Sequence, residues 1–185
     1  DAPENLEDVF TLPNHGLEIA KNISTTEPDL AAVKASRPDQ SDCFLGPNVI
    51  ELCRLADITF LGLHGGEGEN GKLQATFDLL GIRYTGPDSL GCALAMDKGV
   101  TKVIFQRCNV STPGGGWLYK KDLDKPLSEM GLSLPVVVKP CSGGSSIGVY
   151  IVNTEEEYRE ALEKSFQYED ELIIEPYIKG REIAC

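Results

Sequence analysis

The hydrophobic and polar positions of the N-terminal half predict alternating helices and strands. In chain order we expect a short helix over residues 49–55, a buried strand over 57–63, a helix over 72–80, a short strand over 82–85 and a long helix from Asp88 or Ser89 to about Arg107. Gly81 follows the second helix in the position that favours a left-handed residue, so that helix should stop there. Strands that alternate with helices are typical of a parallel sheet.

The pattern changes after residues 112–116, a break rich in glycine and proline. Two runs of β-branched residues, 136–139 and 149–152, predict a hairpin. Thr154 and Glu157 have the spacing of a capping box, which predicts a helix from Glu155 to Phe166. The apolar residues 171–178 predict the next strand.

The length of 185 residues allows one generous core or two small ones, and the change in element order favours two. We predict an α/β chain that begins with a partial parallel-sheet domain over residues 1–90. An antiparallel hairpin-plus-helix unit should follow over residues 91–170, and residues 171–185 should begin a further unit.

Composition narrows the class of protein. The sequence contains 17 Lys and Arg residues against 29 Asp and Glu, which gives a net charge of −12. This charge disfavours binding to nucleic acid or to an anionic membrane. An anionic ligand must therefore be held by a few individual cations. The six cysteines show no Cys-x-x-Cys pair or metal-ligand spacing, which favours reduced thiols. No run approaches the roughly 20 apolar residues of a membrane span, and the first residues lack the pattern of a signal peptide. We therefore expect a soluble, cytoplasmic protein.

The glycine- and serine-rich loop of residues 143–148 is the strongest candidate for chemistry. It joins two β-type runs, so it is neither a Walker-type loop nor a dinucleotide fingerprint, both of which lead from a strand into a helix. Its backbone amides can approach an anion closely, its serines add hydroxyl donors, and Lys139 adds a cation. The alternative is an ordinary surface hairpin with a solvated lysine.

Other polar positions have a functional and a plain interpretation. His64 follows a predicted parallel strand, at the end where ligands bind in open α/β sheets, so it could contact a ligand; the alternative is a residue of a structural turn. Glu67 is better explained as a solvated acid. Lys98, predicted to lie mid-helix, would by itself be a solvent-facing lysine. Glu175 and Glu182 suit recognition of an amino group and a ribose diol, although such carboxylates are commonly just solvated.

Several short motifs, taken in order and spacing, resemble the D-alanine:D-alanine ligase family of the ATP-grasp superfamily from about Arg37 onward. They are His64-Gly65, Gly68-Glu69-Asn70-Gly71 with Gln74, Leu80-Gly81-Ile82 with Tyr84-Thr85-Gly86, Ala93 to Lys98, Val138-Lys139-Pro140, Gly144-Ser145-Ser146 with Gly148, and Ile174-Glu175 with Ile178, Gly180 and Glu182. Each motif alone is weak, but the set is highly specific.

The resemblance implies a role for each matched residue. The implied ATP-binding residues are Lys98, Lys139, Gly143, Gly144, Ser145, Ser146, Gly148, Glu175, Ile178 and Glu182. Ser145, His64 and Glu69 are implied to lie at the first D-alanine subsite. Glu175 and Ile178 would form the adenine hinge, and Glu182 would bind the ribose hydroxyls.

The implied reaction is ATP-dependent ligation of two D-alanines to D-alanyl-D-alanine through an acylphosphate, for peptidoglycan precursor and cell-wall synthesis. The implied partners are ATP, D-alanine, Mg²⁺ or Mn²⁺ and a second subunit in a homodimer, without nucleic acid or membrane. A first subdomain of an ATP-grasp fold would then occupy residues 91–170.

The match also has gaps. We find neither the family's opening strand nor its C-terminal half. We therefore expect the metal ligands to lie beyond Cys185, and we expect the isolated chain to be inactive and to bind nucleotide weakly. Strand 172–178 should be left as an unpaired edge of the sheet. Two alternatives stay open. One is another ATP-grasp ligase, joining D-alanine to D-lactate or D-serine, and the other is a non-catalytic nucleotide-binding fragment.

Overall fold

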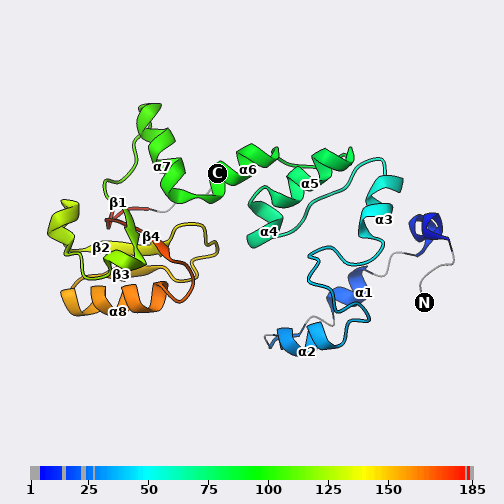
Figure 1. Ribbon diagram of the computed structural model, residues 1–185, viewed down its shortest axis with the longest axis horizontal. Coiled ribbons are helices and arrows are strands. Elements are labelled where there is room, and N and C mark those ends of the chain that lie inside the picture. Colours follow the sequence, from blue (N-terminus) through cyan, green and yellow to red (C-terminus); the bar gives the residue numbers. More distant parts are fainter. Residues whose placement is uncertain (1–4, 14–15, 22–23, 27, 182, 184–185) are drawn as a thin grey trace. The chain divides into compact units, whose positions relative to one another are not determined.

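The computed structural model describes residues 5–13, 16–21, 24–26, 28–181 and 183 (Figure 1). Their elements are η1 (Leu6–Thr11), α1 (Gly16–Ala20), α2 (Leu30–Ala35), α3 (Val49–Leu55), α4 (Gly66–Glu69), α5 (Lys72–Leu80), α6 (Ser89–Met96), α7 (Lys98–Arg107), β1 (Gly116–Tyr119), η2 (Lys120–Asp122), η3 (Leu127–Met130), β2 (Val136–Pro140), β3 (Tyr150–Val152), α8 (Glu155–Ser165) and β4 (Glu171–Pro176). The chain divides into two compact units, residues 1–60 with 81–85, and residues 61–80 with 86–185.

The first unit contains the short helices and one parallel pairing. The predicted helix over 49–55 is confirmed as α3, against which η1 packs. Thr59 pairs with Tyr84 in the predicted parallel direction, and the Thr59 amide donates to the Arg83 carbonyl at 2.8 Å. The prediction of a buried strand over 57–63 is wrong, because Ile58 and Phe60 are 56% and 81% exposed. A parallel strand is buried when strands flank it and helices cover it, and the described residues supply only this single bridge.

The second unit begins with three helices, and α5 packs against both α4 and α6. The prediction for α5 is confirmed: it buries Leu73 and Phe77 and stops before Gly81, whose φ is +66°. The preceding segment contains the one-turn helix α4. The buried Gln74 amide donates to the Gly68 carbonyl at 2.9 Å and ties α4 to α5.

The long helix predicted up to Arg107 is in fact two helices. Asp88 begins α6 by accepting from the Gly91 amide at 2.7 Å, and Asp97 begins α7 by accepting from the Val100 amide at 2.8 Å. Asp97 has an extended backbone (φ −84°, ψ 103°), so it ends one helix and caps the next. Lys98 is therefore the first residue of α7, and its predicted mid-helix position is wrong.

The second unit also contains a four-stranded antiparallel sheet in the order β1-β4-β2-β3 (Figure 1). The predicted hairpin is confirmed, since β2 pairs with β3 from Val136↔Val152 to Val138↔Tyr150. β1 was not predicted; it pairs with one edge of β4, and β2 pairs with the other edge. The expectation that strand 172–178 leaves an unpaired edge is therefore wrong.

One face of the sheet packs against α8 and forms the main core. Thr154 caps α8 as predicted: its hydroxyl accepts from the Glu157 amide at 3.1 Å, and the Glu157 carboxylate accepts from the Asn153 amide at 2.7 Å. The side chains of this core are Leu118, Leu127, Val136, Val138, Val152, Tyr158, Ala161, Leu162, Phe166, Leu172 and Ile174. Because side chains alternate along a strand, the odd-numbered residues of β2 and β4 point to the opposite face.

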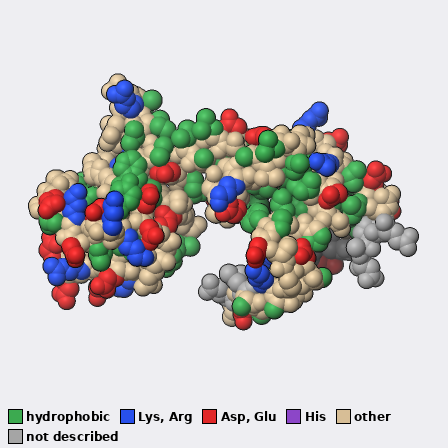
Figure 2. All heavy atoms as spheres, viewed as in Figure 1, with side chains coloured by type: hydrophobic (Ala, Val, Ile, Leu, Met, Phe, Trp, Pro, Cys, Tyr) green, Lys and Arg blue, Asp and Glu red, His purple; other side chains and the backbone are tan. Residues whose placement is uncertain are grey.

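The surface is mixed in charge. On the face shown in Figure 2, acidic and basic side chains are interspersed over the sheet and α8. In the described ranges, no helix is long and apolar enough to cross a membrane. The five cysteines among these residues, at positions 43, 53, 92, 108 and 141, are all unpaired.

Candidate functional site

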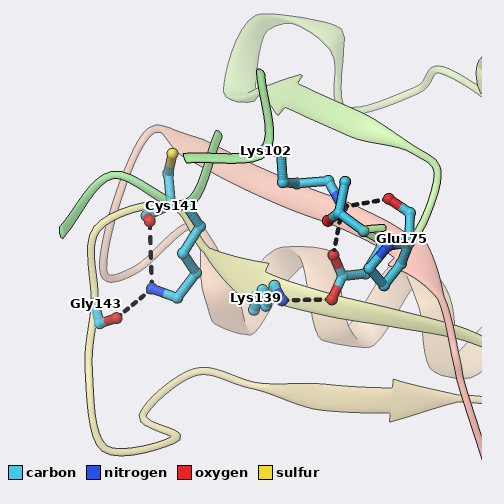
Figure 3. Close-up of polar contacts among 8 residues, drawn as sticks. Lys102, Lys139, Cys141, Gly143 and Glu175 are labelled. Carbon is cyan, nitrogen blue, oxygen red and sulfur yellow. Dashed lines mark hydrogen bonds and ion pairs between the residues drawn. The ribbon is translucent and has the colours of Figure 1, made fainter. Parts of the chain in front are cut away.

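The sheet face opposite α8 carries the candidate site. Lys139 of β2 and Glu175 of β4 lie on this face, and Lys102 reaches the same region from α7 (Figure 3). Lys98 lies one helical turn before Lys102 on α7. The first turn of α7 lies very close to β1. A Cβ atom on Gly99 would stand 2.1 Å from the Trp117 indole, so glycine permits this approach.

Glu175 lies between two ammonium groups. Its carboxylate accepts from Lys102 Nζ at 2.8 Å through one oxygen and from Lys139 Nζ through the other. The side chains are well shielded, with exposed fractions of 12% for Glu175, 9% for Lys102 and 21% for Lys139. Burial alone would raise the pKa of Glu175, but the hydrogen bonds from Lys102 and Lys139 outweigh it and lower the pKa below its ordinary value. The carboxylate is therefore ionised and fully paired at neutral pH.

Lys98 holds the start of the glycine-serine loop. Its ammonium donates to the Cys141 carbonyl at 3.3 Å and to the Gly143 carbonyl, and its backbone amide also donates to Cys141 at 3.0 Å (Figure 3). Burial, followed by the neighbouring positive charge of Lys139, lowers the pKa of Lys98. Two ammonium groups thus lie at the base of one loop.

The loop is anchored at both ends and exposed at its tip. Glu169 accepts from the Ser142 amide at 2.9 Å and from the Ser142 hydroxyl at 2.5 Å, while the Ser165 hydroxyl donates to the Gly148 carbonyl at 3.0 Å. Ser145 and Ser146 both have left-handed backbones, with φ values of 53° and 60°. Within the described part of the chain, the amides of residues 143–146 donate no hydrogen bond, so this tip offers free N–H groups to an anion.

Gly148 closes the loop in a tight place. Its φ is +71°, and a Cβ atom there would stand 2.8 Å from Pro140 and 3.0 Å from Tyr168. Both the backbone conformation and the space therefore require glycine.

Cys141 is a structural residue beneath the site. Its thiol donates to the Asp97 carboxylate at 3.1 Å, and burial is the main cause that raises its pKa to about 11. A thiol with such a pKa is protonated at neutral pH and is a poor nucleophile.

His64 and Glu69 lie in a separate part of the second unit. Glu69 accepts from the Gly65 amide and closes the turn that follows His64, and both side chains are exposed. Glu67 forms an exposed ion pair with Lys72 at 2.8 Å, in agreement with its interpretation as a solvated acid. Within the described residues, no hydrogen bond or ion pair links His64 or Glu69 to the lysines or to the glycine-serine loop.

The two remaining predicted positions lie after β4. Ile178 is 66% exposed, and the neighbouring Tyr177 amide donates to the Pro135 carbonyl at 3.0 Å. Glu182 lies outside the described residues.

Several residues that build the site had no role assigned to them from the sequence, namely Asp97, Lys102, Trp117, Cys141 and Glu169. The position of Lys102, one turn after Lys98, was an available signal, because residues four apart share a helix face. A second signal was the carboxylate of Glu175, which directly follows the apolar residues 172–174 of β4, since a buried charge needs a partner.

Known proteins provide a comparison for this geometry. Two family models match the chain, the D-ala D-ala ligase N-terminus over residues 8–87 and the D-ala D-ala ligase C-terminus over residues 115–185. The chain belongs to the D-alanine–D-alanine ligase family. The resemblance found in the motifs is thereby confirmed.

Individual ligases agree with this membership. A D-alanine–D-alanine ligase from Pediococcus pentosaceus is 41% identical over 183 residues, which are 98% of this chain and 50% of that relative. The structure of the Bacillus anthracis ligase complexed with ATP has a TM-score of 0.65 at 38% identity, and covers 72% of this chain and 43% of that one. A VanG D-Ala:D-Ser ligase from Enterococcus faecalis has a TM-score of 0.62 at 34% identity, covering 67% and 37%. The chain spans about half the length of the curated ligases it matches, and its predicted ATP-grasp fold class is confirmed.

Proposed function

We propose that the chain provides the ATP-phosphate site of a ligase that joins two D-alanines to D-alanyl-D-alanine. The observation that carries this proposal is the position of Lys98 and Lys139 at the base of a loop whose amides at residues 143–146 donate to no other described residue. Two cations and a row of N–H donors match the charge and the acceptor oxygens of a triphosphate. The ATP complex of a similar ligase from Bacillus anthracis supports the proposal.

The charges of this site suit phosphoryl transfer. Transfer of the terminal phosphoryl group spreads negative charge over its oxygens, and cations already in place stabilise that charge without reorganising. Lys139 would act on the phosphate chain, and Lys98, which donates to the Gly143 carbonyl, would fix the loop that covers it. A closed loop would also exclude water, which hydrolyses an acylphosphate.

Substrate positions follow the family resemblance. We propose that residues 1–90 supply His64 and Glu69 to the first D-alanine subsite, and that Ser145 of the glycine-serine loop also lies there. Residues 91–170 would hold ATP, and residues 171–185 would supply the adenine hinge at Glu175 and Ile178 and the ribose contact at Glu182. The assembly proposed for the complete enzyme is a homodimer.

The divalent cation of the family, Mg²⁺ or Mn²⁺, neutralises phosphate charge when it is bound. Among the described residues, no group of three or more His, Cys, Asp or Glu side chains is arranged to hold a metal ion. These residues do not fit a metal site, so we assign none of them to the cation.

The similarity to a D-Ala:D-Ser ligase supports a second candidate, a ligase that accepts D-serine in place of the second D-alanine. The phosphate site would be the same for both reactions. The two candidates differ only in the acceptor amine.

The test is an assay of ADP release by the full-length protein, with the product identified by mass spectrometry. We expect ADP release that depends on D-alanine and yields D-alanyl-D-alanine when D-alanine, D-serine and D-lactate compete. A D-alanyl-D-serine product would favour the second candidate. Lys139→Met should abolish most turnover, whereas Lys125→Met, at an exposed lysine, should not. Equal turnover in the two variants, or ADP release that needs no amino acid, would refute the proposal.

A further inference from the structure

We propose that Lys102 is a positioning residue for the phosphate site: it supplies the permanent counter-charge of Glu175, and so leaves Lys139 free to bind phosphate. This inference rests on the proposed function, because it assigns the anion of the site as a phosphate chain. It concerns a residue that no motif singled out.

The hydrogen bonds of the two lysines differ in number. Lys102 Nζ donates to Glu175 at 2.8 Å, to the Pro113 carbonyl at 2.6 Å and to the Thr112 hydroxyl at 3.4 Å. An ammonium group has three N–H donors, so Lys102 has a partner for each of them. Lys139 Nζ has one partner within the described residues, a Glu175 oxygen, and is the more exposed of the two side chains. Of the two lysines that contact Glu175, Lys139 is therefore the one that keeps donors for a new ligand, as far as the described residues go.

The sheet register explains why both lysines reach one carboxylate. Val137 pairs directly with Glu175, so Lys139 stands diagonally across from Glu175 on the same face. Lys102 reaches the other oxygen from α7 (Figure 3). The group of three side chains thus carries two positive charges and one negative charge, a net charge of +1.

This charge balance decides what happens when a phosphate chain arrives. Lys139 must turn from Glu175 toward the phosphate, and without Lys102 it would leave a buried carboxylate unpaired beside a polyanion. Both the unpaired charge and the repulsion between like charges oppose binding. With Lys102 in place, Glu175 stays neutralised and the charge of Lys139 acts on the ligand alone.

The test uses the 185-residue chain and titration calorimetry with inorganic tripolyphosphate, which has no adenine to confuse the result. Lys102→Met brings the net charge of the group to zero, and we expect its tripolyphosphate affinity to fall at least about tenfold. Lys102→Arg keeps the charge and should stay within about threefold of the wild type. Lys102→Met combined with Glu175→Gln restores the net charge of +1, and should also restore affinity to within about threefold.

The double variant separates positioning from a structural role, because it lacks both Lys102 and the carboxylate that Lys102 serves. It also keeps the proposal testable if Lys102→Met alone fails to fold, since removing both charges leaves no carboxylate to neutralise, and the Lys139 ammonium that loses its partner is partly exposed. A double variant that folds but binds as weakly as a Lys139→Met chain would overturn the inference. Wild-type affinity in Lys102→Met would overturn it equally.

A second measurement does not depend on any ligand. Reductive methylation followed by peptide mass spectrometry reports how readily the Lys139 amine reacts. We expect slower labelling of Lys139 in Lys102→Met, where it alone neutralises Glu175, and faster labelling in the double variant. Unchanged labelling in both would contradict the shared counter-charge. If the wild type binds neither ATP nor tripolyphosphate, the proposed function fails, and the labelling still decides the charge sharing.

Discussion

Lys139→Met is the sharpest test of the phosphate site, because it removes one ammonium group and keeps most of the apolar stem. In the folded chain this ammonium contacts Glu175, and Lys102 also contacts Glu175 at 2.8 Å. Removal of one partner from a buried ion pair costs about 3–5 kcal/mol when the other charge is left unpaired. Glu175 keeps Lys102 here, and Lys139 is partly exposed, so we expect a loss of stability of only about 1 kcal/mol.

The cost to ATP binding should be larger than the cost to folding. A hydrogen bond between charged groups contributes about 1.5–3 kcal/mol. Each 1.4 kcal/mol corresponds to a factor of ten, so the dissociation constant for ATP should rise by roughly 10- to 150-fold. Adenosine, which has no phosphate, should bind the variant and the wild type alike.

The assay is calorimetric titration of both chains with ATP and with adenosine, together with urea unfolding to measure stability. Lys125→Met serves as the control, since this lysine is exposed and far along the chain from the loop. An unchanged ATP dissociation constant would refute the assignment of Lys139. An equal loss of ATP and adenosine affinity would also refute it, because it would indicate general damage to the fold.

Three further predictions follow from individual contacts. Lys98→Met removes the ammonium that holds the Gly143 carbonyl, so we expect faster amide hydrogen exchange over residues 143–148 and an ATP dissociation constant raised about tenfold or more. Gly99→Ala should lower the free energy of unfolding by about 1–3 kcal/mol in urea titrations, although alanine favours helices, because its Cβ would stand 2.1 Å from Trp117. The pKa of Glu175 is lowered on folding, so its ion pairs stabilise the protein above pH 4.5 and lose this effect as the pH falls through the folded value. Glu175→Gln should thus melt below the wild type at pH 7, and the difference should narrow below pH 4.5.

Elements with a strong local signal were predictable from the sequence. The capping box at Thr154 and Glu157 identified α8, and the glycine after Leu80 identified the end of α5. The β-branched runs identified the hairpin of β2 and β3. In each case the energy that fixes the element comes from residues close together in the chain.

Elements that depend on distant partners were not predictable in the same way. Apolar composition suggested a buried strand over residues 57–63, but Phe60 is 81% exposed, because burial requires neighbours that the sequence pattern does not name. β1 is a strand because Gly116 to Tyr119 pair with β4, more than fifty residues later in the chain. The break between α6 and α7 was missed for a different reason. The capping role of Asp97 was a local signal, but it lay within a long apolar stretch that resembled one helix.

The site itself combines both kinds of information. Lys139 and the loop lie in one continuous segment, so a motif could identify them. Glu175 and Lys102 are 73 residues apart, and Lys98 is 45 residues from the carbonyl of Gly143 that it holds. The family motifs assigned Lys98, Gly143 and Glu175 to one site but not Lys102, and the contacts of the four residues with one another come only from the fold. The fold therefore adds information on charge that the motifs lack. Lys102 of α7 neutralises the buried carboxylate of Glu175, and Lys139 of β2 keeps its positive charge for a ligand.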